Sequence, residues 1–260
     1  MTWDHFIYFA LPAAHFWVFA GLAAMRKKSP VAVNGFMLAG LALFTAFIIG
    51  LWMELERPPL RTMGETRLWY SFFLALVGYI TYRHWKYPWL LLFSGVVASV
   101  FIGVNILKPE IHSKALMPAL QSYYFVPHVT VYILSYAMLG VATIASGMQL
   151  WKLSHGGTDK QLYAFMDNIV YIGFGFLALG MLTGALWAKE AWGHYWSWDP
   201  KETWAFITGA AYLVYIHMRL RRAHQEFTLW TLPVAFILLM ITWVGVSYLP
   251  SAQGSIHVYS

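Results

Sequence analysis

Residues 31–53 read VAVNGFMLAGLALFTAFIIGLWM, and no Lys, Arg, Asp or Glu interrupts this run. A helix rises about 1.5 Å per residue, so a run of this length crosses the roughly 30 Å of hydrocarbon in a bilayer. Similar apolar runs lie near 6–25, 68–82, 87–107, 124–151, 168–188, 203–218 and 228–249. The sequence therefore predicts an all-α, polytopic bundle of about eight transmembrane helices.

The composition also indicates a membrane protein. Of the 260 residues, 60% are hydrophobic and only 11% are charged, which leaves too few charges for a water-soluble globule of this size. We expect a single integral membrane domain over residues 1–260, with four N-terminal helices in 1–114. The run at 68–82 is short and the last run contains Pro233, so these two segments carry the weakest signals.

The distribution of positive charge predicts the orientation. The connections after the first, third, fifth and seventh runs contain ten Lys and Arg residues against three acidic residues, whereas the alternate connections contain seven of each. Since cytoplasmic loops are enriched in Lys and Arg, both termini should lie on the outer, periplasmic side. The same asymmetry explains the basic pI of about 9.4, so the charge does not indicate a nucleic-acid partner.

The chain contains no cysteine. It therefore forms no disulfide and offers no thiolate as a nucleophile or metal ligand. Any thiol chemistry that it supports needs thiols from a partner protein.

An acidic helix start is predicted on the outer side. Asp199 fits the N-cap, Pro200 the first helical position and Glu202 the third, as in a capping box. Capping alone therefore accounts for the acidic residues here.

Residues 187–204, WAKEAWGHYWSWDPKETW, hold five of the fourteen tryptophans and surround that helix start. Aromatic residues gather at membrane interfaces in any case. Indoles also combine a flat apolar face with one N–H donor, so the cluster equally fits a platform for a flat aromatic ligand. Both interpretations stay open on the residues alone. The cluster consists of Trp192, Trp196, Trp198 and Trp204.

Histidines are the candidates for metal chemistry. His128 begins the fifth run and His257 lies in the C-terminal tail, so topology places both on the side of the tryptophan stretch. His217 follows Thr203 by 14 residues, about 21 Å further along the seventh run and toward the inner side. His15 is the histidine expected deepest in the membrane. Two imidazoles on opposite faces of a macrocycle are ordinary axial ligands of haem iron, which makes His128 and His257 a possible pair.

Two segments carry a resemblance to a known family. Residues 192–204, WGHYWSWDPKETW, and 212–219, YLVYIHMR, resemble the tryptophan-rich (WWD) haem-binding signature of the cytochrome c assembly family. The WDPKE ending is similar to the CcsA (ResC) branch of the System II pathway and less similar to the CcmC proteins of System I. The resemblance covers roughly residues 115–260, which it identifies as a haem-handling core with the WWD loop at 187–204.

This resemblance implies a function and its partners. CcsA-like proteins work with a CcsB (ResB) partner as a holocytochrome c synthase, or haem lyase. They carry haem b to the outer side and attach it to the Cys-X-X-Cys-His segment of apocytochrome c. A thioredoxin-like reductant for the thiols is a further implied partner.

The resemblance also implies the binding residues. His128 and His257 match the two outer axial ligands of haem iron, although the tail reads SIHVY where the family usually has GLHSY. His217 matches an inner haem ligand whose counterpart normally belongs to CcsB; His84 and His15 are poorer substitutes for that counterpart. No catalytic residue is expected apart from these ligands. The remaining cofactor-binding residues are Trp192, Trp196, Trp198, Asp199 and Trp204.

Two other functions remain open. A haem exporter would need the tryptophan loop but no apocytochrome contact. A haem-containing electron-transfer subunit would place paired histidines at mid-membrane depth, where the sequence offers His15. We expect the protein in a bacterial inner membrane, with a thylakoid membrane as the alternative.

Overall fold

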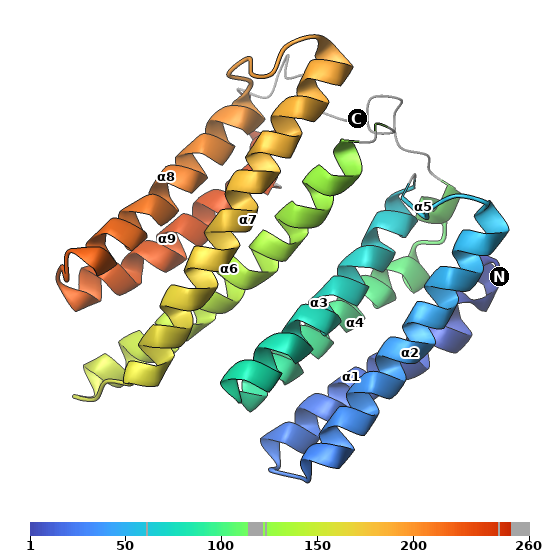
Figure 1. The fold of residues 1–260 in the computed structure, drawn as a ribbon, viewed down its shortest axis with the longest axis horizontal. Helices are drawn as coiled ribbons and strands as arrows, with labels where there is room; N and C mark the ends of the chain where they lie inside the picture. The colour runs from blue at the N-terminus through green and yellow to red at the C-terminus, as the bar shows by residue number, and fades with distance from the viewer. Residues whose placement is uncertain (61, 114–121, 123, 244, 251–260) are drawn as a thin grey trace. The chain divides into compact units, whose positions relative to one another are not determined.

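The computed structural model describes residues 1–60, 62–113, 122, 124–243 and 245–250 (Figure 1). Every regular element in these residues is helical, which confirms the predicted all-α class. The elements of the first half are η1 (Trp3–His5), α1 (Phe6–Met25), α2 (Pro30–Leu55), α3 (Met63–Trp85), α4 (Pro88–Leu107) and the short α5 (Glu110–Ser113). Those of the second half are α6 (Phe125–Ser154), α7 (Lys160–Trp192), α8 (Pro200–Leu220), α9 (Gln225–Trp243) and η3 (Gly245–Tyr248).

The chain forms two compact units, Met1–Gln121 and Ser122–Ser260. In the first unit, α1 contacts α2 and α4, and α3 contacts the same two helices. In the second unit, α6 contacts α7 and α9, and α8 contacts the same two helices. Each unit is therefore a four-helix bundle in which successive helices are neighbours and the first also meets the last.

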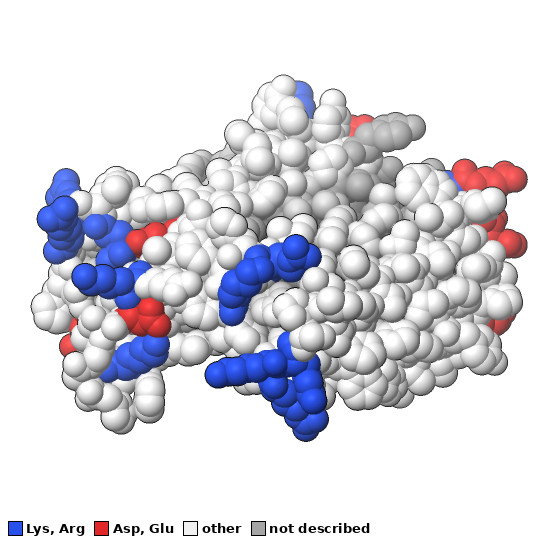
Figure 2. Space-filling model, turned by 60° about the horizontal axis from the view of Figure 1, so that its bottom comes forward, with Lys and Arg blue, Asp and Glu red and all other residues white. Residues whose placement is uncertain are grey.

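Within the part of the chain that the structure describes, six helical segments are long and apolar enough to cross a membrane. They are Trp3–Met25, Pro30–Leu55, Pro88–Leu107, Pro127–Ser154, Lys160–Trp192 and Gln225–Trp243. Many large apolar side chains on them face outward, such as Val31 at 81% and Ile237 at 60% exposure, as expected of surfaces that meet lipid. Wide areas of the face in Figure 2 accordingly carry neither acidic nor basic side chains. The protein is an integral membrane protein.

The two remaining long helices correspond to the predicted runs at 68–82 and 203–218. The structure extends them to Met63–Trp85 in α3 and Pro200–Leu220 in α8, because each has a well-formed N-cap beyond its apolar run. Neither is among the six apolar spans, so eight crossings, like the orientation of the termini, stay a prediction. Pro233 lies inside α9, which continues through it.

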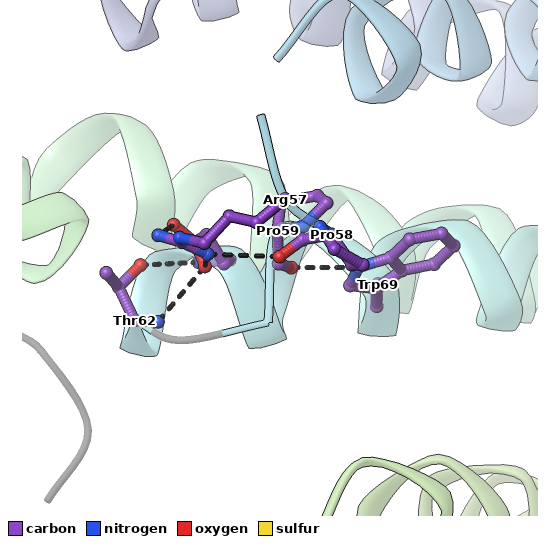
Figure 3. A network of polar contacts seen from close by, with 6 residues as sticks. Arg57, Pro58, Pro59, Thr62 and Trp69 are labelled. Carbon is purple, nitrogen blue, oxygen red and sulfur yellow. Dashed lines mark hydrogen bonds and ion pairs between the residues drawn. The ribbon is translucent and has the colours of Figure 1, made fainter. Parts of the chain in front are cut away.

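A buried carboxylate organises the start of α3 (Figure 3). Glu65 is 1% exposed, and Arg57 donates two hydrogen bonds to it at 2.9 and 3.0 Å. Thr62 and Glu65 also form a capping box, with both backbone-to-side-chain distances at 3.2 Å. The indole of Trp69 donates to the carbonyl of Pro59 at 3.0 Å. These contacts attach the connection between α2 and α3 to the first unit, because a buried carboxylate is stable only when paired.

Candidate functional site

The loop between α7 and α8 has a defined backbone at both ends. Helix α7 ends at Trp192, and Gly193 follows it with a φ of +86°, a left-handed conformation that glycine adopts without strain. Helix α8 begins at Pro200, and its N-cap is Asp199, whose carboxylate accepts from the N–H of Lys201 at 2.9 Å. Pro200 occupies the first position and Glu202 the third, so the predicted capping box is confirmed.

Glu202 also holds the loop that precedes α8. One of its carboxylate oxygens accepts from the backbone N–H of Ser197 at 2.8 Å, the hydroxyl of Ser197 at 3.3 Å and the N–H of Asp199 at 3.2 Å. Trp198 has a φ of +58°, which is unusual for a large side chain, and Thr203 donates to its carbonyl at 3.1 Å. The acidic residues therefore shape the tryptophan loop by hydrogen bonding.

His128 lies in the first turn of α6, against α7. Its Nδ1 is 2.8 Å from the carbonyl oxygen of Gly180. The imidazole stacks on Trp187 at 5.7 Å and 22° between the ring planes, and the ring of Tyr132 meets it edge-on at 4.6 Å. The half-buried His128 is thus held by the Gly180 carbonyl and by the rings of Trp187 and Tyr132.

The tryptophans of the loop make two described sets of contacts. Trp192 packs edge-on against Trp187 at 4.7 Å, which connects it to the surroundings of His128. Trp196 meets Trp198 at 5.7 Å, and Trp198, which is 62% exposed, also meets Phe206 of α8.

The ends of the helices account for the shared location of these residues. His128 is near the start of α6, Trp192 ends α7, and Trp204 lies in the first turns of α8. In an antiparallel four-helix unit these three positions lie at the same end of the bundle. The structure thus brings His128 and the tryptophan loop to one end of the second unit. His257 lies outside the described residues.

His217 lies near the opposite end of α8. It is exposed, and its Nδ1 is 2.8 Å from the carbonyl oxygen of Leu213. It lines a shallow, mostly apolar recess of about 430 Å³, which Arg221, the residue after α8, also lines. The recess is lined by Ala210, Leu213, Val214, His217, Met218, Arg221 and Ala223.

An ion pair fixes the rotation of α8 next to this recess. Arg219 donates to both oxygens of Asp167 on α7, at 2.7 and 2.6 Å, and the Tyr215 hydroxyl donates to the same carboxylate at 2.9 Å. Residues 215 and 219 therefore face α7, while His217 between them faces outward. His15 and His84 are exposed residues of the first unit.

Sequence analysis included Trp187 in the tryptophan stretch but did not place it, Tyr132 or Gly180 next to His128. Trp187 is 3% exposed and stacks on the imidazole, whereas Tyr132 and Gly180 contact it from α6 and α7. A signal was present in residues 180–184, GMLTG, because two glycines four residues apart let a second helix approach closely.

Comparison with protein families identifies relatives over nearly the whole chain. The family described as Cytochrome C assembly protein matches residues 13–252. The Cytochrome c biogenesis protein CcsA of Chlorella vulgaris is 33% identical over 262 residues, covering 83% of this chain and 82% of that protein. That of Synechococcus sp. (strain RCC307) is 29% identical, covering 92% of this chain and 88% of the cyanobacterial protein.

Two further matches each cover about half of a protein that is longer than this chain. The CcsA of Chlamydomonas reinhardtii is 38% identical over 161 residues, which cover 58% of this chain and 46% of the algal protein. The solved structure of Cytochrome c Heme Lyase CcmF matches 97% of this chain and 48% of that chain, with a TM-score of 0.68 and 16% identity. At this identity the likeness to CcmF concerns the fold.

The family match and the similarity to CcsA proteins agree with the tryptophan signature at 192–204. The chain belongs to the cytochrome c assembly protein family, in its CcsA branch.

Proposed function

We propose that this chain carries haem b across the membrane and attaches it to apocytochrome c, together with a CcsB-type partner. Membership of the cytochrome c assembly family supports a role in cytochrome c biogenesis and haem handling. The observation that carries the finer proposal is the arrangement of His128, whose imidazole is held by a backbone carbonyl and two aromatic rings beside the tryptophan loop.

The outer haem site uses His128 and His257 as its two axial ligands. A metal-ligating histidine ordinarily donates its second ring N–H to a carbonyl or carboxylate, and His128 makes such a contact with Gly180. The faces of Trp192, Trp196, Trp198 and Trp204 line the macrocycle, since indoles offer flat apolar surface. Asp199 and Glu202 contribute by holding the loop that presents these rings.

The inner site forms around His217. Its ring opens onto an apolar recess, which suits a porphyrin face, and Arg221 supplies a cation for the haem carboxylates. The partner contributes the second axial ligand there. The outward orientation of His217, secured by Asp167 and Arg219, makes it accessible to another membrane helix.

The attachment step needs no cysteine of this chain. Each thiol of the Cys-X-X-Cys-His segment adds to one vinyl group: sulfur bonds to one vinyl carbon, and the thiol hydrogen goes to the other. The addition transfers no net electrons, so a thioredoxin-like reductant serves only to keep the thiols reduced beforehand. The histidine of the segment then replaces one axial imidazole. The chain thus contributes by orienting the haem and shielding its iron from water.

Co-expression with a CcsB-type partner and a secreted Cys-X-X-Cys-His reporter tests this function. Covalent haem on the reporter, detected by haem staining after denaturing electrophoresis, is the expected result. Haem that reaches the outer side without attachment, in cells whose reporter thiols are reduced, would leave the exporter alternative. Retention of function in a bacterial inner membrane, with the reporter in the periplasm, would also support the expected localisation over a thylakoid-specific role.

A further inference from the structure

Two glycines of α7 form a notch that receives aromatic side chains from α6. A Cβ atom added to Gly180 would lie 2.4 and 2.5 Å from two ring atoms of Tyr132. A Cβ atom added to Gly184, one turn later, would lie 2.7 Å from both Cε1 and Nδ1 of His128. Real Cβ atoms do not approach other atoms this closely, so both rings occupy space that only glycine leaves open.

The notch also determines which nitrogen of His128 carries the proton. The carbonyl oxygen of Gly180 only accepts hydrogen bonds, so the 2.8 Å contact requires a proton on Nδ1. In the neutral ring Nε2 is then the basic nitrogen, the one with a lone pair for a metal. Trp187 stacks on the same ring, which restricts its rotation out of this position.

We propose that Gly180 and Gly184 are positioning residues that orient His128 as an Nε2 ligand of the outer haem iron. The inference rests on the proposed function, because it assumes that His128 binds iron. The missing side chain of Gly184 leaves room for the imidazole, and the carbonyl oxygen of Gly180 determines which ring nitrogen carries the proton. The hydrogen bond further makes Nε2 a stronger donor to iron, which stabilises the ferric state.

The decisive variant is Gly184→Ala, purified with the CcsB-type partner. Its methyl group forces the imidazole away from the Gly180 carbonyl, and we expect about tenfold or greater loss of haem affinity at the outer site, as for other losses of ligand orientation. Absorption spectra of reduced haem and its midpoint potential report the change. Gly175→Ala on the same helix is the matched control, because a Cβ there would meet nothing within 4 Å.

Added imidazole distinguishes two reasons why Gly184→Ala could lose haem: displacement of the His128 ring, or a damaged fold. In His128→Gly, free imidazole should restore the low-spin spectrum, and in the double variant with Gly184→Ala it should still do so, since a free ligand does not depend on the notch. Gly184→Ala with a spectrum and potential like those of Gly175→Ala would overturn the inference. If His128→Ala itself leaves the outer haem unchanged, the proposed function fails instead.

A second measurement leaves both glycines unchanged and so does not depend on the folding of Gly184→Ala. Nitrogen NMR of the haem-free protein with ¹⁵N-labelled histidine, with His128 assigned by comparison with His128→Gln, should show a protonated Nδ1 and a bare Nε2. A proton on Nε2 with a bare Nδ1 would contradict the proposed orientation directly.

Discussion

The substitution Glu202→Ala tests whether hydrogen bonding at the start of α8 holds the tryptophan loop. It removes the acceptor of three hydrogen bonds, from two N–H groups and one hydroxyl. Ser197 is exposed, so water replaces its lost acceptor at little cost, whereas Asp199 is 8% exposed and water replaces the lost acceptor of its N–H much less readily. An unsatisfied buried donor costs about 1–3 kcal/mol. We therefore expect the ordered loop to lose about 2 kcal/mol, a factor of about 30.

Hydrogen–deuterium exchange measures this loss directly. Amides of residues 193–199 should exchange about 30-fold faster in Glu202→Ala, in proportion to the free energy lost. Glu202→Gln, which keeps one acceptor oxygen, should fall between the wild type and the alanine variant. Glu226→Ala is the control, because Glu226 is an exposed residue in the first turn of α9. Unchanged exchange in the loop of Glu202→Ala would refute the reasoning.

Three further predictions concern other parts of the chain. Arg57→Gln should destabilise the first unit by about 2–3 kcal/mol in thermal unfolding, because it removes the cation that donates two hydrogen bonds to buried Glu65; equal stability would contradict this. The hydrogen bond from Lys152 lowers the pKa of Asp159, so the ionised carboxylate stabilises the folded protein. This contribution is complete above the ordinary Asp pKa, about 3.9, and is lost as the pH falls through the lowered pKa. Asp159→Asn should therefore lose less stability between about pH 6 and about pH 3 than the wild type does, in the same unfolding assay. Arg221→Gln should weaken retention of haem about fivefold but leave haem dimethyl ester unaffected, as measured by co-purification; equal effects on both would exclude a carboxylate contact.

The sequence predicts the helices well because lipid demands long apolar runs with internally satisfied backbones. Where the apolar run is short, the capping residues indicate the start of the helix better than the run does. Thr62 and Glu65 begin α3 several residues before the run at 68–82, and this pattern is readable in the sequence. The N-cap of α8 at Asp199 was predicted from its capping residues and is confirmed.

The surroundings of His128 were harder to predict. They depend on the register between α6 and α7, which is set by packing across helices that lie far apart in the sequence. Trp187 comes 59 positions after His128, and only the folded unit shows that the two rings stack. The pair of glycines at 180 and 184 indicates close helix packing, but not which side chain fills the space. The pairing of His128 with His257 stays a prediction.

The central claim is that His128 and His257 hold haem iron on the outer side. The most direct test compares absorption spectra of the wild type, His128→Ala and His257→Ala, each purified with the CcsB-type partner and with equal amounts of protein. We predict that both variants lose the low-spin signal of the outer haem, and that imidazole restores it. Unchanged haem content and unchanged axial spectra in both variants would contradict the account.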